Sequence, residues 1–434
     1  MTILRVEGIS ALVVGMERSG VASVELLARR GARVTATDLE AKAGETLEKL
    51  GVKFELQRPE VFEGRDAIVL SPGVPAGLPE LEQARRKGAE VIGEVELASR
   101  FLRGPILGIT GSNGKTTTTA LVGHILGECG VAAQVGGNIG RAATAMVDSS
   151  RPDQWNVLEL SSFQLETVRD FRARIGVCLN VTPDHLDRHR TFEAYAAAKR
   201  RLVESADRTV LNADDAVCAG WGTPRTVWFS LTQSGDVCLK GDWIEMNGRP
   251  VLNVNDLPIR GRHNVENAMA AMAASGLAGA DASGMGIAIT TFRAVEHRLE
   301  FTRRVHDVDY YNDSKATNVD AALKAIDAFG GGLWVILGGK DKGSDYAPLR
   351  EPLRTKARAA LLIGAAAPKI ASQIAGAVEL VDAGTLDHAV REAARRAAPG
   401  ETVLLAPACA SFDQFENYEH RGRVFKQIVE AMED

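Results

Sequence analysis

The chain has few cysteines, and their spacing shows no pairing. The five cysteines stand far apart along 434 residues, so the sequence predicts neither a disulfide framework nor a cysteine-based metal site. Long apolar runs are also missing, because no stretch approaches the roughly 20 residues of a membrane span. The first residues lack the pattern of a signal peptide. These absences predict a cytoplasmic protein with no membrane span.

Positive charge is not in excess. The 51 lysines and arginines and the 56 aspartates and glutamates leave a net charge of -5, which argues against non-specific binding to nucleic acid or to a membrane surface. We therefore expect small-molecule partners, and we separately expect a monomer. Hydrophobic residues at 45% and charged residues at 25% are typical of a globular protein. Since domains usually hold about 100 to 200 residues, the length predicts three of them.

The most informative segment is residues 108–119, which read Gly-Ile-Thr-Gly-Ser-Asn-Gly-Lys-Thr-Thr-Thr-Thr. Glycines let backbone N–H groups turn toward phosphate oxygens, Lys115 can bridge the outer phosphates, and the Thr116 hydroxyl can hold Mg²⁺. Apolar residues before the loop predict a buried strand, and the spacing after it predicts a helix. The strict pattern would place a glycine where Ile109 stands. We interpret the segment as a variant ATP-binding loop, with an ordinary glycine-rich turn as the alternative.

The first 40 residues predict a strand, a helix and a second strand. The strands are expected at 10–14 and 33–38, with a glycine turn at 15–20 between the first strand and the helix. An acidic residue, Asp38, ends the second strand, as in folds that bind dinucleotides. The fingerprint is incomplete because Glu17 stands where a glycine would let a pyrophosphate approach. NAD, another nucleotide-containing ligand and a purely structural turn all remain open.

A second turn follows the apolar run at 67–70. It reads Ser-Pro-Gly-Val-Pro at 71–75 and is expected at the carboxyl end of a strand, where open α/β sheets bind ligands. We expect it to line the same pocket as the first turn.

Two residues in the middle of the chain, Glu159 and His185, have the surroundings of chemically active groups, and a third, Lys199, does not. Glu159 lies in an otherwise apolar predicted strand, where a carboxylate is costly unless it meets a cation, so Mg²⁺ or a structural ion pair is expected. His185 lies in the segment 178–189, which leads from an apolar predicted strand into a loop dense in Asp and His. It could be a metal ligand, a proton carrier or a histidine satisfied within the loop. Lys199, taken alone, is only a basic residue of a predicted helix.

The last third of the chain predicts another α/β domain. Buried-strand runs at 333–339, 359–364 and 402–407 alternate with alanine-rich helical stretches. A polar turn at 312–318 precedes a helix whose amino end could face an anion. Lys342 follows the first of these strands and could meet a carboxylate or phosphate, or be solvated. The sequence thus predicts an α/β protein with domains at 1–95, 96–298 and 299–434.

Together with further motifs, these features resemble the muramyl (Mur) ligase family, the ATP-dependent amide-forming enzymes of peptidoglycan precursor synthesis. The motifs occur in the family's order over nearly the whole chain. They are the loop at 110–116, Gly136-Gly137-Asn138-Ile139-Gly140, Glu159-Leu160-Ser161-Ser162-Phe163-Gln164, Asp184-His185, His263-Asn264 with Asn267, His297-Arg298, and Asn312-Asp313-Ser314-Lys315-Ala316-Thr317-Asn318. The segment 407–422 and the compact first domain are similar to those of the members that add D-glutamate.

The resemblance implies a fold and a reaction. The fold is a Rossmann-like N-terminal domain, a central P-loop mononucleotide-binding domain with a mostly parallel sheet, and a Rossmann-like C-terminal domain. In the reaction, the alanyl carboxylate of UDP-N-acetylmuramoyl-L-alanine takes the γ-phosphoryl group of ATP. The amine of D-glutamate then attacks the acyl phosphate, phosphate departs, and a new amide is formed. Two Mg²⁺ sites and a carbamylated Lys199 are also implied.

The resemblance also implies roles for individual residues, which we carry over by motif. Lys115, His185 and Lys199 would be catalytic, and Thr116, Glu159, His185 and the Lys199 carbamate would hold metal. ATP would contact Gly111, Ser112, Asn113, Gly114, Lys115, Thr116, Thr117, Asn267, Arg298, Asp313 and Lys315. The UDP-linked substrate would contact Ser19, Asp38, Gly73, Asn138 and His185, and D-glutamate would contact Thr317, Lys342, Ser411 and Tyr418.

The chain departs from the family at two of these places. Glu17 replaces the usual glycine of the first turn, which puts the diphosphate contact in doubt. Tyr418 stands where phenylalanine is also found. Three alternative functions are a dehydrogenase that uses only the first turn, a motor or switch ATPase that uses only the ATP loop, and a sister or folate-extending ligase that adds another amino acid.

Overall fold

The computed structural model describes residues 6–40, 44–293 and 295–433. It divides into two compact units. One unit holds the chain up to Val254 together with Asn267–Ile289, and the other holds Asn255–Glu266 and the chain from Thr290 onward. The domain limits at 95 and 298 stay predictions.

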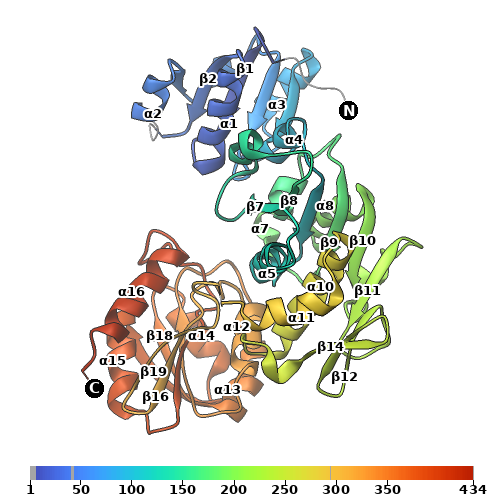
Figure 1. Cartoon of the computed structure of the whole chain (residues 1–434). Coiled ribbons are helices and arrows are strands. Elements are labelled where there is room, and N and C mark those ends of the chain that lie inside the picture. The colour runs from blue at the N-terminus through green and yellow to red at the C-terminus, as the bar shows by residue number, and fades with distance from the viewer. Residues whose placement is uncertain (1–5, 41–43, 294, 434) are drawn as a thin grey trace. The chain divides into compact units, whose positions relative to one another are not determined.

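The amino-terminal part of the first unit is a parallel sheet whose strands run in the order β3-β2-β1-β4-β5. Its strands and helices are β1 (Ser10–Val14), α1 (Arg18–Arg29), β2 (Arg33–Asp38), α2 (Gly44–Lys49), β3 (Lys53–Leu56), β4 (Ala67–Leu70), α3 (Pro79–Arg86), β5 (Glu90–Gly93) and α4 (Glu94–Ser99). The predicted strand, helix and strand at the start are confirmed (Figure 1). The predicted turn at 15–20 was too long, because α1 already begins at Arg18.

Side chains of β1 alternate between two apolar clusters, as the period of a strand requires. Ala11 and Val13 pack with Val24 and Leu27 of α1. Leu12 and Val14 face the other way, and their cluster includes Leu81 of α3. Because both faces are covered, these strands read as continuous apolar runs.

The rest of the first unit is built on a sheet with the strand order β14-β13-β12-β11-β10-β9-β6-β8-β7. The elements are β6 (Ile106–Thr110), α5 (Lys115–Glu128), β7 (Ala133–Gly137), β8 (Trp155–Glu159), α6 (Ser162–Leu165), β9 (Ala173–Cys178), α7 (Leu186–His189), α8 (Phe192–Glu204), β10 (Ala206–Asn212), α9 (Ala216–Ala219), β11 (Thr226–Ser230), β12 (Val237–Lys240), β13 (Trp243–Met246), β14 (Arg249–Asn253), α10 (Arg262–Leu277) and α11 (Ala282–Thr290). The pairs β12–β13 and β13–β14 are antiparallel, and the other described pairs are parallel. Strand β6, the glycine loop and α5 follow in the predicted order.

Glu159 is the last residue of β8, so the predicted acid at the end of an apolar strand is confirmed. One local prediction needs correction, because the loop predicted after the apolar strand β9 contains the one-turn helix α7. Both segments lie at or after the carboxyl ends of parallel strands, where ligands of such sheets bind.

The second unit contains a sheet with the strand order β15-β16-β20-β17-β18-β19. Its elements are β15 (Glu300–Val305), β16 (Val308–Asn312), α12 (Val319–Asp327), β17 (Leu333–Gly338), α13 (Arg350–Lys356), β18 (Ala357–Ile363), α14 (Ala367–Ile374), β19 (Glu379–Gly384), α15 (Leu386–Arg396), β20 (Thr402–Leu405) and α16 (Tyr418–Glu430). Only the described pair β15–β16 is antiparallel in this sheet. The third α/β domain of the prediction is confirmed.

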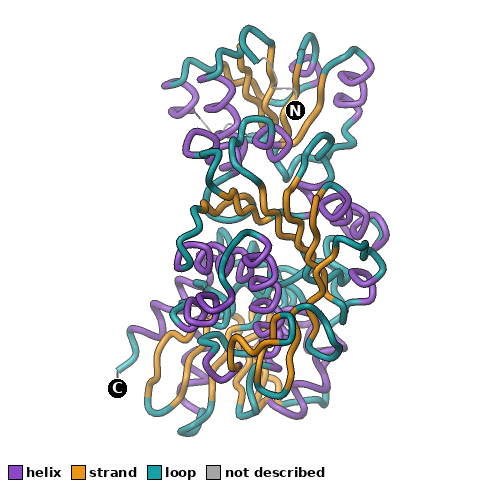
Figure 2. Tube along the Cα trace, turned by 45° about the vertical axis from the view of Figure 1, so that its right-hand side comes forward, coloured by secondary structure: helices purple, strands orange, loops and turns teal. Residues whose placement is uncertain are grey.

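Helices cover both faces of this sheet, as the ribbon and tube views show (Figure 1, Figure 2). Leu333, Val335 and Leu337 of β17 pack in a cluster with residues of α12, α13 and α14. Trp334 and Ile336 point to the opposite face and pack with residues of α15 and α16. Within the described residues, no helix is both long and apolar enough to cross a membrane.

Candidate functional site

The glycine loop closes over its own lysine. The Lys115 ammonium donates to the carbonyl oxygens of Gly111 and Ser112, each at 2.8 Å. The loop is fixed to the neighbouring strand end, since Asn113 N donates to Asn180 Oδ1 and Ser112 N to the Asn180 carbonyl, each at 2.9 Å. Thr116 and Thr117 are buried at the start of α5. The loop, its lysine and a helix amino end are thus brought together, as triphosphate binding requires.

Gly114 is a loop position where both the backbone conformation and a close neighbour exclude a side chain. Its φ of +85° is left-handed, and a Cβ there would lie 2.2 Å from Asn267 Oδ1. Asn267 Oδ1 also accepts from the Thr118 hydroxyl at 3.3 Å, so the amide is held against the loop.

We expect Gly114→Ala to weaken ATP binding by about tenfold or more, because the loop must shift and a left-handed alanine costs about 1 to 2 kcal/mol. Calorimetric titration with a non-hydrolysable ATP analogue measures the effect. Gly127→Ala on the same helix is the control, since nothing lies within 4 Å of an added Cβ there. Unchanged affinity in Gly114→Ala would contradict the role assigned to the loop geometry.

The Glu159 carboxylate, at the end of β8, uses only one of its two oxygens in a hydrogen bond with the described residues. Its Oε1 accepts from Asn138 Nδ2 at 2.8 Å, while Oε2 is buried and has no hydrogen-bond partner among the described residues. A buried carboxylate oxygen without a donor is costly. The sequence alternative of a structural ion pair finds no support, because Glu159 forms no ion pair with the described residues. This oxygen and the Thr116 hydroxyl are of the kinds that Mg²⁺ prefers, so the chemistry of the residues present fits the ion.

Lys199 is completely enclosed on α8. It is 1% exposed, and its ammonium donates to the Gly111 carbonyl at 2.7 Å. The ammonium also lies 4.6 Å from the ring centre of Tyr195. Burial, and secondarily the charge of Lys115, lower the pKa of Lys199 to about 7. A large fraction of this amine is therefore neutral near neutral pH, which gives it a nucleophilic lone pair.

His185 directly precedes α7 and has a left-handed conformation, with a φ of 54°. Its Nε2 lies 3.7 Å from Asp184 Oδ2, and its ring packs edge-on against Phe163 at 4.8 Å between centres. The imidazole is about one-third exposed, so it can reach a bound ligand. A satisfied loop histidine and a functional one are both compatible with these contacts.

A buried network connects the ATP loop to α7. The Ser112 hydroxyl donates to the Thr182 carbonyl and contacts the Tyr195 hydroxyl, each at 2.9 Å. The His189 ring packs edge-on against Tyr195 and contacts the Ser162 hydroxyl through Nε2 at 3.0 Å. Sequence reasoning missed His189 and Tyr195, although their spacing on either side of a helix start was visible.

A pocket of about 630 Å³ joins the two glycine turns of the first unit. The expectation that residues 71–75 line the same pocket as the first turn is confirmed. The predicted residues Ser19, Asp38, Gly73 and Asn138 all line it, and His185 does not. The lining also includes Gly15, Glu17, Arg18, Leu39, Gln57, Ser71, Pro72, Val74, Pro75, Leu78, Gly137, Gly140, Ala142 and Gln164.

Close backbone contacts hold the first glycine turn, which lines the pocket. Gly20 must be glycine, since a Cβ there would lie 1.8 Å from the Gly15 carbonyl oxygen. The Ser71 hydroxyl donates to that same carbonyl at 2.7 Å. Asp38 Oδ2 accepts from the Met16 backbone N–H at 2.6 Å, so this acid also holds the turn. The strand-end cap and the ligand contact are therefore compatible roles for Asp38.

Arg18 is a pocket residue that sequence reasoning missed. It is exposed at the first position of α1, and its Nη1 donates to the Gly140 carbonyl at 3.3 Å. The preceding residue, Glu17, makes no side-chain capping bond to the helix. A basic residue at the start of a helix that follows a glycine turn was the signal that could have found it.

In the second unit, three loops meet beyond β16, β17 and β20. Ala408 N donates to the Ala316 carbonyl at 2.9 Å, and Lys340 N to the Ala410 carbonyl at 2.8 Å. The Ser314 hydroxyl donates to the Tyr418 carbonyl at 2.8 Å. These contacts bring together the loops that carry the four residues predicted for D-glutamate, namely Thr317, Lys342, Ser411 and Tyr418.

The same loops surround a buried cation. Arg421 is fully buried and donates to the Cys409 and Ser314 carbonyls and to the Ser314 hydroxyl. The Lys315 ammonium lies 3.7 Å from the ring centre of Tyr418. Burial raises the pKa of Asp313 to about 7 against the opposing charge of Arg298. Of the predicted residues here, Ser411 is buried and Lys342 is exposed.

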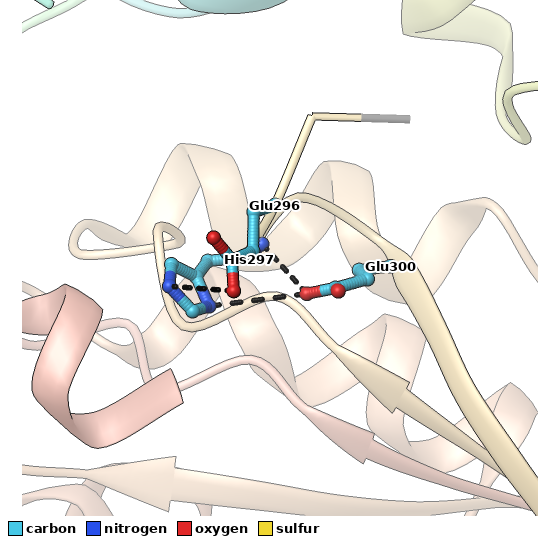
Figure 3. Close-up of side chains that lie close together, drawn as sticks. All are labelled: Glu296, His297 and Glu300. Carbon is cyan, nitrogen blue, oxygen red and sulfur yellow. Dashed lines mark hydrogen bonds and ion pairs between the residues drawn. The ribbon is translucent and has the colours of Figure 1, made fainter. Parts of the chain in front are cut away.

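Glu296, His297 and Glu300 form a cluster that could hold a metal, since one ligand atom from each lies within 4.8 Å of the others (Figure 3). Lys426 already neutralises it, with its Nζ at 3.1 Å from Glu296 and 2.6 Å from Glu300. His297 Nδ1 accepts from Asn312 Nδ2 at 2.9 Å. We interpret the cluster as an ion-pair network at the start of β15.

The predicted ATP residues fall on both units. Gly111 to Thr117 and Asn267 belong to the first, and Arg298, Asp313 and Lys315 belong to the second. The D-glutamate residues all belong to the second unit. Their assignment to ligands stays a prediction.

Models of protein families match most of the chain. A model of the Mur ligase MurD-like N-terminal domain matches residues 9–93, the Mur ligase middle domain matches 109–275, and the Mur ligase glutamate ligase domain matches 297–409. Two similar curated proteins are both called UDP-N-acetylmuramoylalanine--D-glutamate ligase. The one from Solibacter usitatus is 63% identical and covers 99% of each chain, and the one from Acidobacterium capsulatum is 50% identical and covers 99% of this chain and 97% of its own.

Solved structures share the fold at low identity. UDP-N-acetylmuramate-alanine ligase from Thermotoga maritima superimposes with a TM-score of 0.65 at 20% identity, covering 98% of this chain and 99% of its own. MurF ligase from the same organism, in complex with ADP, gives a TM-score of 0.62 at 16% identity, covering 98% and 95%. The fold of three α/β domains is thus shared across these ligases.

Proposed function

The chain belongs to the Mur ligase family, and from this premise we propose that it joins D-glutamate to UDP-N-acetylmuramoyl-L-alanine at the expense of ATP, as a step of peptidoglycan precursor synthesis. The observation that carries the proposal is the 63% identity, over 99% of both chains, to a relative with that named activity. The motifs of the ATP loop and of the D-glutamate loops agree with it. We further propose that the enzyme works as a monomer in the cytoplasm.

The first chemical step transfers the γ-phosphoryl group of ATP to the alanyl carboxylate. Two anions must approach each other, so their repulsion has to be neutralised. Lys115 leaves its loop carbonyls to bridge the outer phosphates, and the N–H groups of the glycine loop bind phosphate oxygens. Thr116 and Glu159 would hold Mg²⁺, which supplies charge neutralisation when it is bound.

Lys199 is proposed to become a metal ligand after a covalent modification. Its neutral amine attacks CO₂ to form an N–C bond and, after losing a proton to solvent, becomes a carbamate. The change replaces a buried cation by a buried anion, and an ammonium could not be a metal ligand. The carbamate and His185 would hold a second Mg²⁺ next to the acyl phosphate. The low pKa of Lys199 and its full burial support this proposal.

The second chemical step forms the amide. The neutral amine of D-glutamate attacks the acyl carbon, a C–N bond forms, the C–O bond to phosphate breaks, and the amine nitrogen gives one proton to the departing phosphate or to solvent. Lys342 is proposed to meet a carboxylate of D-glutamate, with hydroxyl donors from Thr317, Ser411 and Tyr418. These residues position the amine, which converts an encounter of two solutes into a reaction within one complex.

The proposed function is tested by phosphate release from ATP in the presence of UDP-N-acetylmuramoyl-L-alanine and a panel of amino acids. We expect release to depend on D-glutamate and not on L-glutamate. Turnover with another amino acid would assign the chain to a sister ligase instead. Turnover without any amino acid would favour a simple ATPase.

Arg18 is proposed to bind the diphosphate of the UDP-linked substrate and to offset the charge of Glu17. We expect Arg18→Ala to raise KM for this substrate about tenfold and to leave KM for ATP unchanged, as the loss of one charge-assisted contact implies. Glu17→Gln should lower the same KM, because a negative charge leaves the pocket. Steady-state kinetics at two salt concentrations measures both. If wild type and Arg18→Ala had equal KM values for the UDP-linked substrate, Arg18 would not bind its diphosphate.

A further inference from the structure

A fully buried carboxyl group at the start of α4 has no part in the chemistry above. Glu94 is 1% exposed. Its Oε1 accepts from the Thr144 backbone N–H at 2.7 Å and from the Thr144 hydroxyl at 2.8 Å. Its Oε2 is buried with no hydrogen-bond partner among the described residues. Burial raises the pKa of Glu94, which favours the neutral acid.

Thr144 follows a wall of the substrate pocket along the chain. The pocket is lined by Gly137, Asn138, Gly140 and Ala142, and Thr144 is the second residue of the 3₁₀ helix Ala143–Ser149 that follows. The turn between them is tight, since Gly137 N donates to the Arg141 carbonyl at 2.7 Å. A displacement of Thr144 therefore moves the turn.

The other end of this wall is held independently. Asn138 donates to Glu159 twice, from its backbone N–H to the carbonyl at 2.9 Å and from Nδ2 to Oε1 at 2.8 Å. The wall thus has two attachments, one to the proposed metal ligand Glu159 and one to Glu94. Loss of the Glu94 attachment leaves the Glu159 side in place.

Helix α4 is itself fixed, so that it can serve as an anchor. Its amino end packs closely, because a Cβ on Gly93 would lie 2.0 Å from Thr167 Oγ1. Further along, Glu96 Oε2 accepts from three consecutive backbone N–H groups, those of Arg169, Asp170 and Phe171, at 2.8 to 3.1 Å. The helix is therefore held on the side opposite the wall as well.

We propose that Glu94 is a positioning residue for the UDP-linked substrate, which holds the wall of residues 137–142 in its binding geometry through Thr144. The inference rests on the proposed function for the identity of the substrate. We expect an effect on this substrate and not on ATP, because the two hydrogen bonds from Asn138 to Glu159 stay in place when the attachment to Glu94 is lost.

Three variants test the proposal. Glu94→Ala removes both hydrogen bonds and is expected to raise KM for UDP-N-acetylmuramoyl-L-alanine about tenfold, with kcat and KM for ATP changed by less than about twofold. Thr144→Val removes only the hydroxyl donor and should give a smaller rise, of about threefold. Glu94→Gln keeps an accepting oxygen for Thr144 and should therefore keep KM for this substrate close to that of the wild type.

The control is Ser99→Ala on the same helix, which deletes the buried hydrogen bond from the Ser99 hydroxyl to the Glu96 carbonyl at 2.8 Å. It should lower the melting temperature without changing any KM. If Glu94→Ala behaves like this control, or if all three substrates lose affinity equally, Glu94 is only structural and the proposal fails. If the wild-type enzyme itself shows no D-glutamate-dependent phosphate release, the proposed function fails instead. Direct calorimetric titration of the UDP-linked substrate then still reports whether Glu94 supports the pocket.

Discussion

Replacing Lys199 with alanine is expected to lower turnover by about two to three orders of magnitude while the protein remains folded, because a proposed metal ligand is lost. The expected result follows from the site. The side chain is enclosed, its pKa is lowered to about 7, and its position beside the Gly111 carbonyl and the ATP loop leaves no solvent role for it. Lys199→Arg should be equally inactive, since a guanidinium cannot react with CO₂.

Two measurements separate the carbamate from a simple loss of charge. Carbon-13 NMR of the wild-type enzyme in labelled bicarbonate should show a protein-bound carbamate signal that is absent in Lys199→Ala. Chloride or a short carboxylate should restore part of the activity of the alanine variant, and bicarbonate should not. Full activity of Lys199→Ala, or no carbamate signal in an active enzyme, would contradict the proposal.

The pH dependence follows from the same group. Carbamate formation requires the neutral amine, and the pKa of Lys199 is about 7. As pH falls through that value the amine gains a proton, so at low CO₂ activity should fall below about pH 7 and recover when CO₂ is added. In stability, the unfolded lysine holds its proton up to its ordinary pKa of about 10.4. The unmodified folded protein should therefore gain stability as pH rises from about 7 to 10.

Lys115→Ala is expected to reduce kcat by about a thousandfold, or about 4 kcal/mol in activation free energy, because the lysine contributes most when charge develops on the transferred phosphoryl group. Its ammonium is already held over the loop by the Gly111 and Ser112 carbonyls. Rapid-quench measurement of acyl phosphate formation checks the expected loss in the first chemical step.

The matched control is Lys87→Ala, a surface lysine on the loop after α3 that pairs only with Glu63 among the described residues. It should leave kcat unchanged. If Lys115→Ala raised KM for ATP but left kcat intact, the lysine would bind the ground state and the transition state equally, and the assigned role would be wrong.

Local sequence patterns were sufficient to predict the ATP loop, the buried strands and the family. Residues 108–119 identified the ATP loop because a glycine-rich turn between a strand and a helix leaves few other interpretations. Buried parallel strands such as β17 and β18 were found because both faces are covered, which makes them continuously apolar. The order of motifs along the chain then identified the family, which the 63% identical relative confirms.

Local patterns could not show which residues act together. Lys199 carried no signal in its helix, and only the fold buries it against the ATP loop and lowers its pKa. Arg18 and Glu94 were missed for the same reason, since their partners Gly140 and Thr144 lie 122 and 50 residues away along the chain. The limit of α1 was also misplaced, because Glu17 and Arg18 have no strong preference that marks a helix start.

The amino-acid sequence alone determined the class of fold, the triphosphate loop and the family, because each depends on residues that are neighbours along the chain or on the order of short motifs. Only the tertiary structure decided the protonation and the hydrogen bonding of the side chains at the candidate site. Desolvation and hydrogen bonding act through space, so the neutral amine of Lys199, the unpaired oxygen of Glu159 and the wall held by Glu94 exist only once distant segments have packed together.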